Sequence, residues 1–202
     1  MIRELSQILF AMHLSTHNLQ EVKANCSACS VQLKRPMVNT PIDKQELADV
    51  LLAGHIKHFG KVPSASRLAM GWAQVALENG AGKYSYNHNL GNIGPSSPDQ
   101  HWYFSRIDHN FYEDFDTFDE AAVVYWKTVG HCRGVVQRFD WGGGIVAAKM
   151  LKSCGYFGAD LKAYSDNMAS LYWTGLPYAR AAIDKWLLSQ WHPFALENKN
   201  VQ

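Results

Sequence analysis

The sequence predicts a mainly α-helical, single-domain protein with a small β-hairpin region around residues 95–116. Three observations favour this fold class. Apolar residues recur at helical spacing along most of the chain, and capping residues precede several of these segments. The stretch at residues 100–107, QHWYFSRI, has no helical period and is rich in strand formers. With 202 residues, the chain is long enough to bury a sizeable core and to carry an extension.

We divide the chain into an N-terminal extension at residues 1–40, a main domain at residues 41–195 and a C-terminal tail at residues 196–202. The extension begins with apolar residues at helical spacing, which predicts a helix at residues 1–14. Residues 15–40 mix Cys, Ser, Asn, Lys and Pro without a period. We therefore expect an ordered or disulfide-tied segment there, without catalytic residues.

Two helices open the main domain. Asp43, with Glu46 three residues on, forms an acidic variant of the capping box, and Gly60 ends this first helix. Ser64 starts the central helix, SASRLAMGWAQVALEN at residues 64–79, which is apolar on nearly all sides. A helix of that kind belongs in the middle of a domain, so we expect the rest of the fold to pack around it.

Helical patterns return after the hairpin region. The predicted helices cover residues 118–129, 145–152, 161–173 and 177–191. Thr117 and Glu120 form a capping box for the first of these, and Gly130 is expected to close it. Gly175 and Pro177 separate the last two, since proline is favoured in a first helical turn.

Glu78 lies on the last turn of the central helix, at the negative end of the helix dipole. Asn79, Gly80 and Gly82 follow it, and these residue types end helices in a left-handed conformation. The dipole and any aromatic rings that exclude water raise the pKa of a carboxyl group. An acid that donates a proton near neutral pH requires such a raised pKa. The alternative, which is the commoner case, is a solvated glutamate at a helix end.

The loop after Glu78 combines aromatic rings with amide side chains, in the stretch YSYNHNLGNIG at residues 84–94. Rings stack on the C–H faces of pyranose sugars, and amides bond hydroxyl and N-acetyl groups. A single acid followed by such residues points to glycoside chemistry.

Three segments, in this order, resemble one known family. Residues 76–82, ALENGAG, with residues 89–94, NLGNIG, are similar to the "ALETGWG … NNLFGIK" signature of lysozyme-like peptidoglycan glucosaminidases and muramidases of the autolysin and flagellar-muramidase type. Residues 115–125 are similar to that family's Y-x-S-F-E-E-A-x-x-D-Y helix. Residues 155–164 are similar to its GYATDPxYA segment, with Tyr164 on the last tyrosine.

The sequence also departs from these motifs. Asn79 replaces the usual threonine, Ala81 replaces the tryptophan, and residues 157–160 read FGAD instead of ATDP. These changes leave the fold and the proton donor as expected from the resemblance, and they leave open which glycosidic bond is cut.

The resemblance implies a lysozyme-like fold and a glycoside hydrolase that cleaves the β-1,4-linked glycan backbone of bacterial peptidoglycan, with Glu78 as general acid. Tyr164 would hold a water or the developing charge. Glu113 and Asp116 are the candidates for a second catalytic carboxylate, each with the alternative of an ordinary surface acid. The expected sugar-binding residues are Trp72, Tyr84, Tyr86, Asn87, Asn89, Asn92 and Tyr156.

The sequence is also compatible with three other functions. One is a lytic transglycosylase on the same substrate, and another is a catalytically inactive glycan-binding module. The third is a metal or redox protein built on Cys26 and Cys29, whose CSAC spacing suits a zinc or redox pair. No second pair or closely spaced histidines accompany them, so we expect no metal and no cofactor. For an exported chain we instead expect disulfides, Cys26 with Cys29 and Cys132 with Cys154, although four cysteines allow three connectivities.

Composition narrows the partners. With a formal charge of only +1, the chain has no general electrostatic attraction for nucleic acid. No apolar run is long enough to insert in a membrane. We expect a monomer that binds peptidoglycan glycan strands. Seven acids between residues 99 and 120 would favour de-N-acetylated strands if they border the groove. The activity predicts a secreted or periplasmic protein, and since residues 1–16 contain no convincing export signal, we expect a preceding leader or leaderless release.

Overall fold

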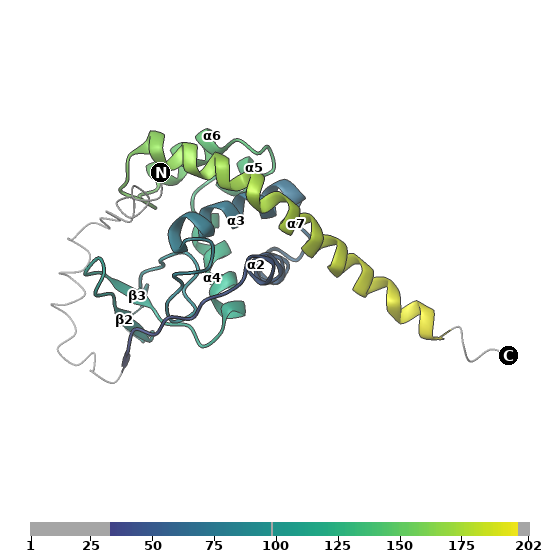
Figure 1. The fold of residues 1–202 in the computed structure, drawn as a ribbon, viewed down its shortest axis with the longest axis horizontal. Helices are drawn as coiled ribbons and strands as arrows, with labels where there is room; N and C mark the ends of the chain where they lie inside the picture. The colour runs from purple at the N-terminus through teal and green to yellow at the C-terminus, as the bar shows by residue number, and fades with distance from the viewer. Residues whose placement is uncertain (1–32, 98, 198–202) are drawn as a thin grey trace.

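The computed structural model describes residues 33–97 and 99–197, with side chains through residue 191. The predicted helix at residues 1–14, Cys26 and Cys29 lie outside the described residues. The elements in chain order are β1 (Lys34–Arg35), α2 (Lys44–Phe59), α3 (Ala65–Asn79), β2 (Trp102–Phe104), β3 (Phe111–Glu113), α4 (Phe118–His131), α5 (Val135–Phe139), α6 (Gly144–Ser153) and α7 (Leu161–Glu197). The prediction of a mainly α-helical protein with a small sheet is confirmed (Figure 1).

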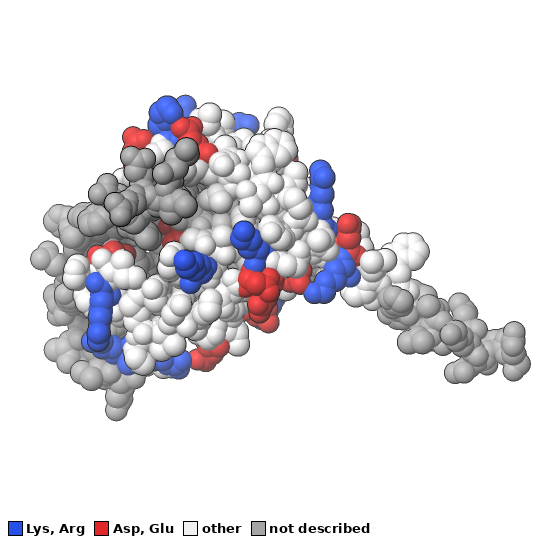
Figure 2. All heavy atoms as spheres, viewed as in Figure 1, with Lys and Arg blue, Asp and Glu red and all other residues white. Residues whose placement is uncertain are grey.

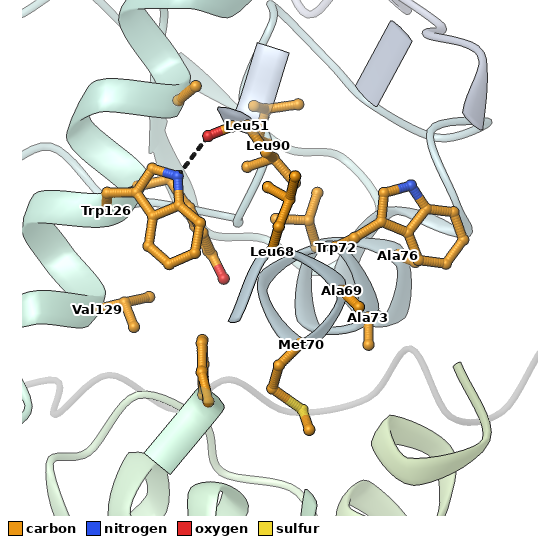
Figure 3. Close-up of a cluster of buried hydrophobic side chains, with 14 of the residues drawn as sticks. Leu51, Leu68, Ala69, Met70, Trp72, Ala73, Ala76, Leu90, Trp126 and Val129 are labelled. Carbon is orange, nitrogen blue, oxygen red and sulfur yellow. Dashed lines mark hydrogen bonds between the residues drawn. The ribbon is translucent and has the colours of Figure 1, made fainter. Parts of the chain in front are cut away.

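Helix α3 is the centre of the core, as its sequence predicts. The hydroxyl of Ser64 accepts a hydrogen bond from the backbone N–H of Arg67 and so caps the first turn. Residues 68–76 are buried without interruption. Figure 3 shows α3 side chains on several sides of the helix, with Leu68 on the side of Trp126 of α4 and Trp72 on the opposite side. The indole N–H of Trp126 donates a 2.8 Å hydrogen bond to the carbonyl of Leu51 in α2. This hydrogen bond satisfies the polar atom of the indole ring, so Trp126 can be buried without leaving a donor unpaired.

The C-terminal helix corrects the prediction of two helices at residues 161–173 and 177–191. Gly175 and Pro177 both lie inside the single helix α7, which continues beyond the body of the protein (Figure 1). A Cβ atom on Gly175 would stand 2.5 Å from the ring of Trp72, so the glycine permits close packing of α7 on α3 and does not end the helix. Proline inside a helix costs about 3 kcal/mol, and packing of α7 against α2, α3 and α6 offsets that cost.

Three smaller features also differ from the sequence predictions. Gly130 lies within α4, which ends at His131. The short helix α5 was not predicted, and neither was β1, which falls inside the predicted extension at residues 1–40. The capping predictions hold, since Asp43 accepts hydrogen bonds at the start of α2 and Thr117 does so at the start of α4.

The sheet lies within the predicted hairpin region, with β1 added along one edge. Strands β2 and β3 are antiparallel, and β1 pairs with β2 in parallel, in the order β1-β2-β3. The register places Trp102 opposite Glu113, Tyr103 opposite Tyr112 and Phe104 opposite Phe111. Tyr103 and Tyr112 are buried, so their face of the hairpin packs inward.

Charged side chains are scattered in small groups on the face shown in Figure 2, where neither sign forms an extended patch. Within the described part of the chain, no helix has the length and apolar character to cross a membrane.

Candidate active site

The end of α3 fixes the position of Glu78. Gly80 adopts a left-handed conformation with φ of 63°, and its N–H donates to the carbonyl of Ala76. The side-chain oxygen of Asn79 accepts a 2.8 Å hydrogen bond from the N–H of Gly82. This tight cap turns the chain sharply after Glu78 and leads it into the loop at residues 84–94.

The carboxyl group of Glu78 is nearly buried, with 9% of the residue exposed. Its Oε1 accepts a 3.0 Å hydrogen bond from the hydroxyl of Tyr164 on α7, and its Oε2 lies 3.3 Å from the amide nitrogen of Asn92. The same amide donates to the main-chain carbonyl of Glu78 at 3.2 Å. Among the described residues, no lysine, arginine or histidine forms an ion pair with Glu78.

Burial raises the pKa of Glu78 to about 7, while the hydrogen bonds from Tyr164 and Asn92 act in the opposite direction. Desolvation raises the pKa by more than the hydrogen bonds lower it, because both donors are neutral and no cation among the described residues forms an ion pair with the carboxylate. A carboxyl with a pKa raised in this way keeps its proton to a higher pH than an ordinary glutamate, so it can donate a proton and exist as the conjugate base afterwards.

Tyr164 is held in place by Phe157. The two rings stack with centroids 3.6 Å apart and planes 5° from parallel, and Tyr164 is buried. Asp160 accepts the N–H of Ala163 and caps this end of α7. The sequence identified Tyr164 from the family motif, but Phe157 was missed because it stands at a departure from that motif.

Tyr156 lies beside the same site. Its hydroxyl donates to the carbonyl of Gly91 at 3.2 Å, and a Cβ atom on Gly91 would stand 2.9 Å from that hydroxyl. The ring of Tyr125 in α4 would stand 3.1 Å from the same Cβ position, and its hydroxyl donates a 2.6 Å hydrogen bond to the side chain of Gln74. Neither Gln74 nor Tyr125 was singled out from the sequence, because each occupies a position that a core residue would also fill.

The loop at residues 84–94 contains a tight turn with a defined backbone conformation. Asn87 and His88 both have positive φ, of 51° and 57°, and the N–H of Asn89 donates to the carbonyl of Tyr86 at 2.9 Å. This is the backbone of a type I′ turn. Tyr86 is half-buried in bridges with Asn39 and Asn89, and Tyr84 is 45% exposed.

Asn89 acts as the internal brace of this loop. Its oxygen accepts the N–H of Ile93, and its amide donates to the carbonyls of Ile93 and Glu113, all at 2.9 Å. The residue is 1% exposed. The structure therefore places Asn89, predicted to bind sugar, where its polar atoms are already bonded within the protein.

Glu113 is brought to this loop from β3. Its N–H donates to the carbonyl of Ile93 at 2.8 Å, and its Oε1 accepts from the side chain of Gln100 at 2.8 Å. Its Oε2 is buried without a hydrogen-bond partner among the described residues. Burial raises the pKa of Glu113 to about 7, and Lys127 opposes this shift. The neighbouring residues Asn92 and Ile93 thus connect the two buried carboxyl residues, one through a side chain and one through the backbone.

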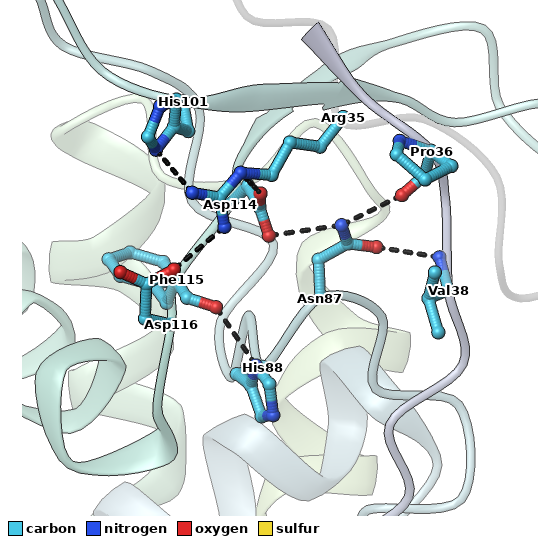
Figure 4. A network of polar contacts seen from close by, with 9 residues as sticks. All are labelled: Arg35, Pro36, Val38, Asn87, His88, His101, Asp114, Phe115 and Asp116. Carbon is cyan, nitrogen blue, oxygen red and sulfur yellow. Dashed lines mark hydrogen bonds and ion pairs between the residues drawn. The ribbon is translucent and has the colours of Figure 1, made fainter. Parts of the chain in front are cut away.

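Asp116 lies in a different setting, the Arg35 cluster formed by Arg35, Asp114, Asp116 and His101 (Figure 4). The guanidinium group of Arg35 contacts Asp116 at 2.7 Å and Asp114 at 3.1 Å. This pairing holds the pKa of the exposed Asp116 carboxyl below its ordinary value.

Asn87 also belongs to the surroundings of the Arg35 cluster. Its amide donates to Asp114 and to the carbonyl of Pro36, and its oxygen accepts the N–H of Val38 (Figure 4). A pocket of about 280 Å³ adjoins the cluster, and its lining includes neither Glu78 nor Tyr164. The predicted site residues Asn87 and Asp116 are therefore gathered around Arg35, and in the described part of the chain neither forms a hydrogen bond or ion pair with Glu78.

Trp72 is placed in the core rather than at the predicted sugar-binding surface. It is fully buried, its N–H donates to the carbonyl of Lys44 at 3.0 Å, and it stacks on Tyr178. Its polar atom and its ring are both used to attach α2 and α7 to α3.

The predicted disulfide between Cys132 and Cys154 is not formed, because both are free thiols in the structure. The two side chains are neighbours at the ends of α4 and α6. Burial and the hydrogen bond with Cys154 raise the pKa of Cys132 to about 12. Within the described residues, no three histidine, cysteine or acidic side chains gather as a metal site.

A scan against family models, a search of curated proteins and a search of solved structures each found no match to this chain.

Proposed function

We propose that this protein is a glycoside hydrolase with a lysozyme-like fold, which cleaves the β-1,4-linked glycan backbone of bacterial peptidoglycan. Glu78 is the general acid and protonates the glycosidic oxygen of the leaving sugar. The observation that carries the proposal is the uncharged environment of Glu78. Its carboxyl is buried, hydrogen-bonds only to the neutral donors Tyr164 and Asn92 among the described side chains, and has a pKa raised to about 7.

Tyr164 orients the carboxyl group during proton transfer. Its hydroxyl donates a hydrogen bond to Oε1, so Oε2 is the oxygen atom that carries the proton toward the substrate. Once the proton has left, the hydroxyl also stabilises the carboxylate, because a hydrogen bond to the charged form lowers its energy. Asn92 assists the same change of charge from the side of Oε2.

Glu113 is a better candidate than Asp116 for the second carboxyl group. It is buried, has one oxygen atom without a hydrogen-bond partner among the described residues, and is attached to the loop that carries Asn92. Asp116 is exposed and paired with Arg35, which reduces its capacity as a base or nucleophile. With Glu113 as nucleophile the anomeric configuration is retained, and with Glu113 as base for a water it is inverted.

A lytic transglycosylase remains the second candidate function. That reaction needs one acid and an attack within the substrate, and it is favoured because Tyr164 and Asn92 are the only side chains among the described residues that hydrogen-bond the Glu78 carboxyl. A third outcome is a module that binds the glycan without cleaving it. The proposed substrate places the protein in the periplasm or outside the cell, as a monomer on glycan strands, including strands that are de-N-acetylated.

One digestion separates these outcomes. Purified peptidoglycan is incubated with wild type and with Glu78→Gln, and the soluble products are analysed by mass. A hydrolase gives reducing products, whereas a transglycosylase gives anhydro products that are lighter by one water. Glycan binding by wild type without any product would identify the binding module, and cleavage by Glu78→Gln at the wild-type rate would end the proposal.

A further inference from the structure

Charge is divided unevenly along the chain, although the total is close to zero. Residues 99–120 contain seven acids and a single arginine, whereas residues 121–159 contain five lysines and arginines and a single acid, Asp140. Asp140 is bound to Arg67 and to the hydroxyl of Ser64 at the start of α3, so its charge is compensated there. The stretch that contains α5 and α6 therefore has a net positive charge.

Three large apolar side chains of the same stretch are open to solvent. Trp141 is 78% exposed, Ile145 is 54% exposed and Val146 is 41% exposed. Single exposed apolar residues are ordinary, but several large ones close together in the chain are typical of an interaction surface.

Cations lie directly beside these apolar side chains. The guanidinium group of Arg138 stands over the ring of Trp141, 5.7 Å from its centroid. Lys149 follows Ile145 by four residues and Val146 by three, so the three share one side of α6, and all are exposed. Neither Arg138 nor Lys149 forms an ion pair with any residue that the structure describes. We call these five residues the α6 face.

The backbone that presents Trp141 is fixed by packing. Its N–H donates to the carbonyl of Arg138 at 3.1 Å, and the next residue, Gly142, has a positive φ of 64°. A Cβ atom on Gly142 would stand 3.3 Å from the hydroxyl of Tyr172 on α7. Helices α5 and α6 lie together at one edge of the molecule, at the top of Figure 1. The indole ring is thus held outward by a turn that is packed against α7.

Apolar side chains with adjacent cations suit the boundary between lipid hydrocarbon and anionic headgroups. Tryptophan is enriched at that boundary, and each lysine or arginine near an anionic leaflet is attracted to it. Their long side chains reach the phosphates while the apolar groups lie deeper. Because no helix of the described chain is suited to cross a membrane, such a contact is peripheral.

We propose that the α6 face docks on the surface of an anionic lipid bilayer. Trp141, Ile145 and Val146 enter the boundary between headgroups and acyl chains, and Arg138 and Lys149 bind lipid phosphates. This inference goes beyond the proposed function, since it does not involve Glu78 and holds whether or not the protein cleaves glycan.

The test measures partitioning of the full chain onto vesicles by co-sedimentation. Vesicles of phosphatidylcholine mixed with phosphatidylglycerol should bind the protein, and vesicles of phosphatidylcholine alone should bind it much more weakly. Added salt should weaken the binding, because it screens charges at the surface. We expect Trp141→Ala to lower the partition coefficient about tenfold, through loss of apolar area that leaves water. Arg138→Gln and Lys149→Gln should each lower it about fivefold.

Matched controls separate a lipid contact from a structural effect. Trp191→Ala removes a tryptophan on the distal part of α7 that is 76% exposed, and Lys83→Gln removes an exposed cation just after the C-terminal end of α3. Both should leave partitioning within twofold of wild type. Trp141→Phe keeps an aromatic ring and should restore most of the binding, and thermal unfolding of each variant shows that the fold is retained. Brominated lipids should quench the fluorescence of wild type more than that of Trp141→Ala, which reports contact of this ring with acyl chains.

Each result either supports or overturns the docking surface. Equal binding to neutral and anionic vesicles overturns it, and so does unchanged partitioning of Trp141→Ala. An equal loss of binding in the α6-face variants and in both controls would show attraction without a defined face and would also overturn it. Binding to an anionic polymer such as RNA without binding to vesicles would assign the α6 face to another class of partner.

Digestion of peptidoglycan tests the proposed function separately. Cleavage without vesicle binding overturns the docking surface alone. Vesicle binding that depends on Trp141, in a protein that forms no product, supports the docking surface and leaves only the hydrolase proposal to fail.

Discussion

The hydroxyl of Tyr164 donates a 3.0 Å hydrogen bond to Oε1 of Glu78, although the two residues are 86 positions apart in the chain. Glu78 ends the central helix and Tyr164 lies in the first turns of α7, so packing of α7 on α3 creates the contact. The stacked ring of Phe157 limits the movement of Tyr164. The acid is therefore oriented by Tyr164 of α7 on one side and by Asn92 of the loop that follows it on the other.

Replacing Glu78 with Gln should lower kcat for peptidoglycan cleavage by about 100- to 10,000-fold, the range expected for loss of a general acid. The amide keeps the shape of the side chain, so glycan binding should stay within a few fold of wild type. Product release measured by mass analysis checks the rate. Glu46→Gln, an exposed acid in the first turn of α2, is the matched control and should retain full activity.

Tyr164→Phe should move the alkaline limb of the pH–rate profile upward. The hydrogen bond from Tyr164 lowers the pKa of Glu78, whereas desolvation raises it. Without this hydrogen bond, the pKa of Glu78 should rise above about 7. Because the acid must be protonated to act, activity should persist to higher pH while the maximal rate falls. An alkaline limb that stays in place or moves down would contradict this assignment of Tyr164.

The buried carboxyl of Glu78 should make the protein less stable as pH rises. Its pKa is about 7 in the folded state against an ordinary 4.5, so the folded protein holds a proton that the unfolded chain releases between these values. The stabilisation of the folded state by this proton is complete below about pH 4.5 and is lost as the pH rises through about 7. Its upper limit is about 3 kcal/mol. Glu78→Gln should therefore raise the melting temperature relative to wild type more at pH 8 than at pH 4.5. An equal difference at both pH values would disprove the linkage.

His55 should give the stability of the protein the opposite pH dependence, with stability falling as the pH decreases. It is fully buried in α2, its Nδ1 lies 3.0 Å from the carbonyl of Lys61, and burial lowers its pKa from 6.5 to about 4. The unfolded chain takes up a proton between these values that the folded state excludes, so stability falls as pH decreases from 6.5 to 4. His55→Gln should flatten this acid side of the stability curve. Urea unfolding at pH 7 and pH 5 measures the effect, and an unchanged slope would refute it.

Gly175→Ala should destabilise the protein even though alanine is the better helix former. Propensity alone would favour alanine by about 1 kcal/mol, whereas the new Cβ atom would stand 2.5 Å from the Trp72 ring. Overpacking of this kind costs about 1–3 kcal/mol, so we expect a net loss of stability. Gly143→Ala is the control, because nothing lies within 4 Å of its Cβ position. A rise in melting temperature for Gly175→Ala would show that α7 can move away from α3.

Local signals in the sequence predicted the frame of the candidate site. The apolar pattern of residues 65–77 identified the buried helix, and Gly80 identified its left-handed end. The capping residues Asp43, Ser64 and Thr117 marked three helix starts. These features depend on contacts within a few residues, which a sequence pattern records directly.

The sequence did not distinguish residues that brace the site from residues that line it. Asn87 and Asn89 look alike in the sequence, yet one is bonded to Asp114 and the other to Ile93 and Glu113, and neither amide is free. Trp72 was expected beside a sugar and lies in the core. Partners far along the chain decide these roles, and the local pattern contains no information about them.

The sequence by itself determined the positions of α2, α3, α4 and α6, the capping residues of α2, α3 and α4, the place of Glu78 at a helix end and the hairpin region. Only the tertiary structure decided that this carboxyl is buried between Tyr164 and Asn92, that Asp116 is paired with Arg35, and that α7 is continuous through Gly175 and Pro177. It also decided that Glu113 keeps one oxygen without a hydrogen bond from any part of the chain that the structure describes. The physical reason is that helix propensity and capping act over one or two turns, whereas desolvation, ion pairing and close packing depend on which distant segments meet.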